Sequence, residues 1–573
     1  MACLSFPVKA ILGCLGVILT FGGLYLEFKG FPDIIKEKIK EQLLLSEGTE
    51  TFEAWKEPPL PVYFKVHFFN VTNPTEIVWH GEKPVLKEVG PYVYREMMKK
   101  VDIKYVDAEK TYVSYKQVRS FVFEPEMSGD LKESDLITTL NTPMVAAATK
   151  AEYLPVLFKL MLEFLFIRFQ ERVFTQKDVG SLMFKGYYEP MVEQLSALTG
   201  KTMLVNNTFG YFYPALNVLM ETGTLPLPIQ MFLQHVFAKF NDTDAFVTKP
   251  VNLLTFEGYN DPVLDYIYKV ASKALPLAEI ITLIMNLFGI EVPLVSLILP
   301  DDFKFGLLIG KNNSDDGTYV VHTGRGDSTM FTNLISWKNQ TQLPWWNSDY
   351  CNMMNGTDGG QYPPFLSKKQ RIYIFASDLC RSLYVEFEKE VNVLGIPGYR
   401  FIPPPSVFAD VQSNPDNLCY CTPDDNHCLL SGVLNGSVCQ QGAPIIYSSP
   451  HFYQGDQSYV DAVVGLSPNK SIHETSLDLH PVTGIPLSVV KRIQINIKIK
   501  NFDALPSFRN VPDIIMPVLW VSESASLDGP TAEKLKSQVL RPMVVLNSVS
   551  WAICGVGLVL VLASVIIVCN KKK

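Results

Sequence analysis

The segment Ile493-Gln-Ile-Asn-Ile-Lys-Ile499 alternates isoleucine with polar residues. Successive side chains of a β-strand point to opposite faces, so this pattern predicts a strand with one face on a core and the other in solvent. Val62, Phe64, Val66 and Phe68 alternate in the same way. Turn signals such as Asp315-Asp316-Gly317 separate segments of this kind. The sequence therefore predicts a mainly β domain with antiparallel strands.

Outward from these strands, an uncharged apolar run lies near each end of the chain, at Ala10–Leu26 and at Met543–Cys569. A helix of about 20 apolar residues spans the hydrocarbon core of a bilayer. The first run continues into Glu27-Phe28-Lys29 without a small-residue cleavage site, so we expect an uncleaved anchor rather than a signal peptide. Positive charge at Lys9 and at Lys571–Lys573 flanks the two runs and predicts that both tails are cytosolic.

These anchors predict a two-pass membrane protein with a large domain on the non-cytosolic side. The expected parts are a cytosolic tail at 1–9, a transmembrane helix at 10–26, a lumenal or extracellular ectodomain at 27–541, a second transmembrane helix at 542–569 and a cytosolic tail at 570–573.

Glycosylation sequons fit this topology, because all of them fall between the anchors. The acceptors are Asn70, Asn206, Asn241, Asn312, Asn339, Asn355, Asn435 and Asn469.

Cysteines give a second indication of an oxidising compartment. Four of the ten lie in or beside the anchors, and an even number remains in the ectodomain. These remaining cysteines are Cys351, Cys380, Cys419, Cys421, Cys428 and Cys439. Three disulfides are the expectation, with the pairing left open by the spacing. A zinc site at Cys419, Cys421 and Cys428 is the alternative, which needs reduced thiolates that a secretory lumen disfavours.

Helical periodicity extends from Thr142 to Phe174 and predicts an amphipathic helix. The segments Phe174–Pro190 and Phe246–Pro262 share several residues at matching spacing, which suggests a tandem repeat. Ala274–Pro300 is also apolar. Its carboxylates and prolines argue against a third span, because uncompensated carboxylates are costly inside a bilayer.

The sequence offers no motif for catalysis or for nucleic-acid binding. It contains no nucleophile elbow, phosphate-binding loop, dinucleotide fingerprint or zinc-protease motif. With 50 basic and 58 acidic residues, the chain also lacks a basic stripe that would neutralise a phosphate backbone. We therefore expect a protein that is not an enzyme and that needs no cofactor or metal. Arg325-Gly326-Asp327 would suit an integrin ligand, but Gly next to Asp also simply makes turns.

Long, ordered motifs lie on both sides of a region from about Tyr188 to Asp302. Before it stand Gly48-Thr-Glu-Thr-Phe-Glu-Ala-Trp55, His67-Phe-Phe-Asn-Val-Thr-Asn-Pro74 and Glu88-Val-Gly-Pro-Tyr-Val-Tyr-Arg-Glu96. After it stand Cys351-Asn-Met-Met-Asn-Gly-Thr-Asp-Gly359, Ser377-Asp-Leu-Cys-Arg-Ser382 and Lys491-Arg-Ile-Gln-Ile-Asn496. In these motifs the chain resembles the class B scavenger receptor family, and its lysosomal member in particular.

The resemblance implies a fold and a disulfide pairing. The fold is an antiparallel β-barrel-like ectodomain with an apolar tunnel and an apical helical bundle, which would here be expanded over 135–300. The pairing joins Cys351 to Cys419, Cys380 to Cys439, and Cys421 to Cys428.

The resemblance also implies a receptor that captures lipids or lipoproteins at the apex and passes lipid through the tunnel to the membrane. Fatty acids, sterols and phospholipids are the expected ligands, and the sequence is compatible with a homo-oligomer. Cationic candidates for ligand binding are Lys150, Lys159, Arg168 and Arg172; the alternative is that these are solvated charges on a helix.

A second function implied by the resemblance is that of a trafficking receptor for a lumenal hydrolase such as β-glucocerebrosidase. Adhesion through Arg325-Gly326-Asp327 is a third. The lysosomal member uses a histidine on the apical helix as a pH switch, whereas this chain has none between Asp135 and Thr175. The tail Asn570–Lys573 lacks an acidic-dileucine sorting signal, so the sequence is compatible with a location in the lysosomal or endosomal membrane and with one in the plasma membrane.

Overall fold

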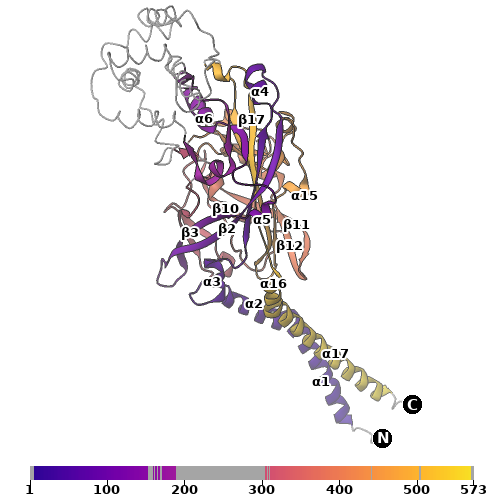
Figure 1. Ribbon diagram of the computed structural model, residues 1–573. Coiled ribbons are helices and arrows are strands. Elements are labelled where there is room, and N and C mark those ends of the chain that lie inside the picture. The colour runs from indigo at the N-terminus through magenta and orange to yellow at the C-terminus, as the bar shows by residue number, and fades with distance from the viewer. Residues whose placement is uncertain are drawn as a thin grey trace, which may run out of the picture. The chain divides into compact units, whose positions relative to one another are not determined.

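The computed structural model describes residues 6–152, 159, 162–163, 166–167, 171–188, 304–305, 307–308, 310–440, 442–502 and 505–569 (Figure 1). The chain divides into two units, Met1–Tyr187 with Phe305–Lys573, and Tyr188–Lys304. The description below concerns the first unit. The second copy of the tandem repeat and the apolar segment Ala274–Pro300 lie outside the described residues.

A large, nearly closed antiparallel β-sheet forms the body of this unit. Its thirteen strands run in the order β10-β11-β12-β15-β16-β17-β1-β2-β3-β8-β9, and β13 and β14 branch from β16. The strands are β1 Val62–Val71, β2 Leu86–Tyr105, β3 Tyr112–Phe123, β8 Ser314–His322, β9 Leu334–Trp337, β10 Ile372–Ala376, β11 Arg381–Val393, β12 Ile396–Ile402, β13 Val433–Asn435, β14 Ile445–Ser448, β15 Ser476–Leu479, β16 Pro486–Ile499 and β17 Ile514–Ser526. This mainly antiparallel fold confirms the prediction from the alternating segments.

Pairing of β1 with β17 joins the N-terminal and C-terminal parts of the chain, with Val66 opposite Val521. A smaller sheet pairs β4 (Leu136–Leu140) with β5 (Phe174–Asp178). The described helices that border the sheets are α3 Glu50–Lys56, α4 Pro74–His80, α5 Pro125–Ser128, α6 Thr142–Ala151, α13 Asp349–Asn352, α14 Gln457–Asp461 and α15 Lys470–His473. The helix predicted to reach Phe174 is wrong at its C-terminal end, because Phe174 pairs with Leu140 as the first residue of β5.

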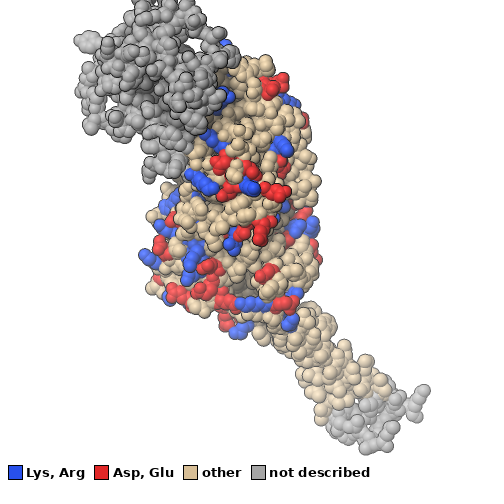
Figure 2. Space-filling model, viewed as in Figure 1, with Lys and Arg blue, Asp and Glu red and all other residues tan. Residues whose placement is uncertain are grey.

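Both ends of the chain form apolar helices that are long enough to cross a membrane, within Ile11–Gln42 and Gly529–Ile566. The N-terminal helix consists of α1 (Phe6–Tyr25), the π-helical segment η1 (Leu26–Gly30) and α2 (Phe31–Gln42). The C-terminal one consists of α16 (Gly529–Leu535), η11 (Lys536–Leu540) and α17 (Arg541–Cys569). On the face shown in Figure 2, charged side chains of both signs are scattered over the β domain and are absent along most of the described part of these helices.

Helices α1 and α17 lie side by side (Figure 1) and meet through small residues. A Cβ atom at Gly16 would come within 2.8 Å of the Gly557 carbonyl oxygen, and one at Gly23 within 2.6 Å of Cys554 Sγ. Small residues allow helices to approach this closely in a membrane. Helix α2 follows α1 in the chain, and its Ile39 is buried in a core cluster of the β domain, so this terminal helix is anchored to the sheet.

Strand β16 differs from the expected half-buried pattern. Its polar residues Gln494 and Asn496 are completely buried rather than exposed. The backbone N–H of His451 donates to Gln494 Oε1 at 2.7 Å, and the Asn496 amide donates to the Ile446 carbonyl at 3.0 Å. The outer face of β16 is therefore covered by other segments of the chain, while Ile493 on the inner face is only half-buried.

Candidate ligand-binding site

The inner face of the sheet is defined by alternation along β2. Tyr92, Tyr94 and Glu96 are buried, whereas Arg95 and Met97 between and beyond them are exposed. Strand β3 continues this face with Phe121, which lies opposite Glu96 in the register. The inner face thus holds large apolar rings and, directly next to them, a carboxyl group.

Two apolar clusters occupy this face. The first cluster includes Phe64, Val66, Phe68, Tyr92, Tyr94, Phe121, Leu519 and Val521. The second cluster includes Trp55, Val113, Tyr115, Tyr319, Val321 and Trp337. Ile493 and Ile495 of β16 pack against both clusters. Apolar surface therefore continues along the inner face from one cluster to the other.

Charged side chains interrupt the apolar surface between the clusters. We call this group the charged belt; its members are Glu96, Arg119, Asp378, Lys491 and Glu523. Glu96 follows Tyr94 by two residues, and Glu523 follows Val521 by two, so each continues the inward-facing row of its strand. Lys491 lies opposite Glu523 in the pairing of β16 with β17.

Ion pairs connect the belt. Lys491 Nζ lies 3.4 Å from Glu523 Oε2, and Arg119 Nε lies 3.6 Å from Glu96 Oε1. Arg119 Nη1 also lies 3.9 Å from Asp378 Oδ2. Desolvation opposes ionisation of both Glu523 and Asp378, but the neighbouring cations outweigh it and lower the pKa of each carboxyl. These two acids are therefore ionised at neutral pH.

Glu96 behaves in the opposite way. Burial, followed by repulsion from Glu523, outweighs the attraction of Arg119 and raises the pKa of Glu96 to about 8. Both of its carboxyl oxygens lack a hydrogen-bond partner among the described residues. Glu96 is thus mostly protonated at neutral pH and is not satisfied by the surrounding protein.

A neighbouring buried pair on the same face shows the ordinary arrangement. Lys100 Nζ lies 3.3 Å from Asp358 Oδ2 and donates to Gln117 Oε1 at 3.1 Å. Tyr115 Oη donates to the same Asp358 oxygen at 2.6 Å. This pair is hydrogen-bonded by its neighbours, so it needs no further partner.

A groove of about 540 Å³ lies near the second cluster, between the loop at Pro363–Leu366 and strand β10. Phe365 and Met354 line it and also pack against that cluster. Lys36 Nζ of α2 stands 5.7 Å from the centroid of the Phe365 ring. The volume lies within the range of small-molecule sites, and the groove adjoins the helix that leads to α1.

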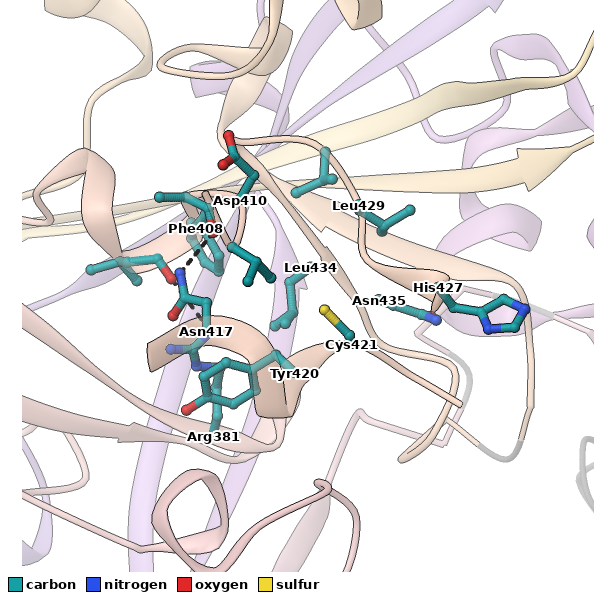
Figure 3. A pocket seen from close by; sticks show the side chains of 14 residues that line it. Arg381, Phe408, Asp410, Asn417, Tyr420, Cys421, His427, Leu429, Leu434 and Asn435 are labelled. Carbon is teal, nitrogen blue, oxygen red and sulfur yellow. Dashed lines mark hydrogen bonds between the residues drawn. The ribbon is translucent and has the colours of Figure 1, made fainter. Parts of the chain in front are cut away.

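A second cavity surrounds Arg381 and is shown in Figure 3. The guanidinium carbon lies 3.6 Å from the centroid of the Tyr420 ring, and Nη1 donates to the Val407 carbonyl at 3.4 Å. The cavity holds only about 40 Å³, which is room for a few water molecules. It is too small for a lipid, and we assign Arg381 a structural role next to the disulfides.

Histidines gather on the outer face of the sheet around Glu88. His67 Nδ1 lies 2.7 Å and His451 Nε2 3.0 Å from the two Glu88 oxygens. Burial opposes ionisation of Glu88, but these hydrogen bonds outweigh it and hold its pKa far below the ordinary value. The His473 ring stacks on the His451 ring with a centroid distance of 4.3 Å. Burial, followed by repulsion from His451, lowers the pKa of His473 to about 4.

The structure forms three disulfides, Cys351–Cys419, Cys380–Cys439 and Cys421–Cys428. This is the pairing that the resemblance implies, so the cysteines of the alternative zinc site are all oxidised here. The three disulfides join irregular segments that follow β9, β10, β12 and β13.

Six of the predicted glycosylation acceptors are described, and Asn206 and Asn241 lie outside the described residues. Asn312, Asn339 and Asn469 are exposed, while Asn70 and Asn355 are half-buried. Asn435 is also half-buried, and its amide donates to Thr422 Oγ1 at 3.1 Å. The exposed acceptors are the most accessible to a transferase.

The predicted cationic ligand site falls only partly on described residues and stays a prediction. Lys150 belongs to α6, Lys159 is half-buried, Arg172 is exposed, and Arg168 lies outside the described residues. Asp327 of the Arg-Gly-Asp sequence caps a short 3₁₀ helix, where its carboxylate accepts hydrogen bonds from the Thr329 N–H at 2.9 Å and Oγ1 at 2.6 Å. These bonds give Asp327 a structural role in a turn.

A nearly closed antiparallel sheet with an apolar helix at each end of the chain and disulfides on its periphery fits an ectodomain that is anchored in a membrane. The model of the CD36 family matches residues 14–226 and 214–568, and the chain belongs to this family. Lysosome membrane protein 2 of Homo sapiens is 33% identical over 517 residues, covering 90% of this chain and 86% of its own. Scavenger receptor class B member 1 of Sus scrofa is 29% identical over 559 residues, covering 98% and 89%.

Family membership supports a class B receptor, and the two terminal helices fit a two-pass membrane protein.

Sequence reasoning missed the charged belt, although a signal was present. In Tyr92-Val-Tyr-Arg-Glu96 the acid occupies the inward-facing position of an alternating strand, as does Arg119 two residues before Phe121.

Proposed function

We propose that this protein is a class B receptor that binds lipid or lipoprotein ligands and passes lipid through the interior of the β-sheet toward the membrane. It acts as a receptor and conduit and not as an enzyme. Its two terminal helices are the membrane anchors, with both tails in the cytosol. The resting compartment is a lysosomal or endosomal membrane or the plasma membrane.

The observation that carries the proposal is the environment of the charged belt. Between 20% and 51% of the side-chain surfaces of Glu523, Arg119, Lys491 and Asp378 is accessible to water. Desolvation by the surrounding protein is nevertheless one of the two largest influences on the pKa of each. Accessibility together with strong desolvation is what a charged lining of an internal space would have, and apolar clusters lie on both sides of the belt, which supports a conduit.

A conduit of this kind has a clear physical advantage. A lipid that crosses water exposes its chain at a cost of about 0.8 kcal/mol for each CH₂ group. Apolar walls at Phe121, Val521 and Ile493 would replace water along the path. The groove beside Phe365, next to α2, offers an exit close to the bilayer.

The experiment is lipid transfer from donor lipoproteins into liposomes that contain the full-length protein. Ile493→Trp places a large ring on the inner face, and Val122→Trp places the same ring on the exposed outer face of β3. We expect transfer to fall about tenfold with the first variant, as for a step that loses about 1.4 kcal/mol. Equal transfer rates for both variants, with both folded, would refute the conduit.

A trafficking receptor for a lumenal hydrolase is the second proposal, favoured by the 33% identity to lysosome membrane protein 2. Co-purification of the full-length protein with lumenal hydrolases at neutral and at acidic pH tests it, and recovery of no hydrolase at either pH removes it.

A further inference from the structure

Arg381 places a positive charge inside the protein without an opposite charge beside it. The residue is 4% exposed. The side chains that act on its pKa are Tyr420, Tyr384 and Tyr350, and none of these is a carboxylate. Burial lowers the pKa of the guanidinium, which nevertheless stays protonated, as arginine does in proteins. A buried charge without a partner is costly, so this cation needs a compensating anion.

The hydrogen-bonding capacity of the Arg381 guanidinium is mostly unused. Nη1 donates to the Val407 carbonyl at 3.4 Å, beyond the usual range of about 2.7 to 3.2 Å. Nε has neither accessible surface nor a partner among the described residues. Nη2 also forms no hydrogen bond within the described part of the chain, but it is not one of the atoms without accessible surface. A ligand can therefore reach the Nη2 end of the side chain and cannot reach Nε.

Aromatic rings decide from which side a ligand can approach. The guanidinium carbon of Arg381 lies 3.6 Å from the centroid of the Tyr420 ring and 5.8 Å from that of Phe408. The Tyr420 ring covers a face of the planar guanidinium, whereas the N–H groups point outward in its plane. A ligand must therefore bind at the open edge, on the cavity that Arg381 lines (Figure 3).

The other polar side chains around this cavity leave the edge free. The amides of Asn417 and Asn435 donate to carbonyl and hydroxyl oxygens of the protein at 2.8 to 3.1 Å. Asp410 also lines the cavity, but its carboxylate accepts a hydrogen bond from Ser431 Oγ at 2.5 Å. Figure 3 shows Asp410 and Arg381 at opposite ends of the cavity. The carboxylate therefore does not neutralise the guanidinium.

We propose that the Arg381 cavity binds a small monovalent inorganic anion, with chloride as the physiological candidate. The anion lies at the open edge of the guanidinium and accepts a hydrogen bond from Nη2. The cavity of about 40 Å³ has room for such an ion, since one water molecule needs about 10 to 15 Å³, and it excludes a lipid head group. This site does not depend on the proposed lipid conduit.

The neighbours of the site indicate what the anion does for the fold. Arg381 follows Cys380 directly, and Tyr420 lies between Cys419 and Cys421. These cysteines belong to the three different disulfides. The anion neutralises a buried charge where the disulfide-bonded segments meet, and so it stabilises this part of the folded protein.

The first test titrates chloride into the full-length protein in detergent and follows the width of the chloride NMR signal, with gluconate keeping the ionic strength constant. Arg381→Met removes the charge and keeps much of the length of the side chain. Arg95→Met is the control, because Arg95 is exposed and pairs with Glu124 at 3.0 Å. We expect saturable broadening by the unmodified protein and by the control, and its loss in Arg381→Met.

A second variant keeps Arg381 and removes the space for the anion. Ala409 lines the cavity and is half-buried, so Ala409→Leu should fill the cavity. The readout is the melting temperature in chloride and in gluconate, because a ligand that binds only the folded state raises the melting temperature. The unmodified protein should melt at a higher temperature in chloride, and Ala409→Leu at the same temperature in both salts. This arm stays informative if Arg381→Met fails to fold.

Three results would each overturn the anion site. The first is the absence of saturable broadening by the unmodified protein, which would leave water as the occupant of the cavity. The second is saturable broadening that persists in both Arg381→Met and Ala409→Leu, which would place the bound chloride elsewhere. The third is a melting temperature of the unmodified protein that is the same in both salts.

Discussion

Replacing Glu96 by Gln should remove a specific pH dependence from the stability of the folded protein. The folded pKa of Glu96 is about 8, well above its ordinary value of 4.5. The folded state therefore holds a proton that the unfolded chain releases, and the resulting stabilisation is complete below pH 4.5 and is lost as the pH rises through 8. From pH 6 to pH 8 the loss amounts to about 2 kcal/mol.

The assay is guanidinium denaturation of the full-length protein in detergent at pH 6 and at pH 8, for the unmodified protein and for Glu96→Gln. The expected result is that the free energy of unfolding falls by about 2 kcal/mol more in the unmodified protein than in the variant. Titrating groups that do not interact with Glu96 cancel in this difference. Glu126→Gln, at an exposed position, should behave like the unmodified protein. Identical pH dependence for unmodified protein and Glu96→Gln would refute the assignment of a buried neutral acid.

Three further predictions address other parts of the fold. His480 is 1% exposed, and burial lowers its pKa to about 4. Because the unfolded chain takes up this proton at a higher pH than the folded protein, acidification from pH 7 to pH 5 should lower the free energy of unfolding by about 2 kcal/mol. His480→Gln should not show this loss when both proteins are denatured at the two pH values. A disulfide stabilises the folded protein more when it closes a longer loop of the unfolded chain. Removing Cys380–Cys439, whose partners are 59 residues apart, should lower the free energy of unfolding by about 4 kcal/mol, and removing Cys421–Cys428, whose partners are 7 residues apart, by about 2 kcal/mol. Equal losses in denaturation experiments would contradict this dependence on loop length. Gly16→Ile should separate α1 from α17 and lower the melting temperature in detergent, whereas Gly22→Ile, with nothing within 4 Å of its Cβ position, should leave it unchanged.

Local patterns were sufficient to predict two of the strands, the mainly antiparallel class of the fold and the terminal helices. The alternation of apolar and polar residues predicts β16 at Ile493 to Ile499 and β1 at Val62 to Phe68, because the period of two is a property of the strand itself. The burial of Gln494 and Asn496 was not predictable in this way. It depends on a segment around His451 that covers β16 from more than forty positions away.

Less of the candidate site than of the fold could be predicted from the sequence. Glu96, Arg119, Asp378 and Glu523 come from distant parts of the chain, and only the closure of the sheet brings them together. Their charge alone suggested surface positions, since most charged residues are exposed. The disulfide pairing likewise came from the family resemblance, because the spacing of the six cysteines allows several pairings.

Photoaffinity labelling tests the central claim most directly. The full-length protein in nanodiscs is incubated with a sterol that carries a photoreactive diazirine, irradiated, and digested for mass spectrometry. The account predicts adducts on inner-face residues such as Phe121, Ile493 and Val521, with competition by unlabelled sterol. Adducts confined to α1, α17 and the outer face of the sheet would contradict a lipid path through the interior.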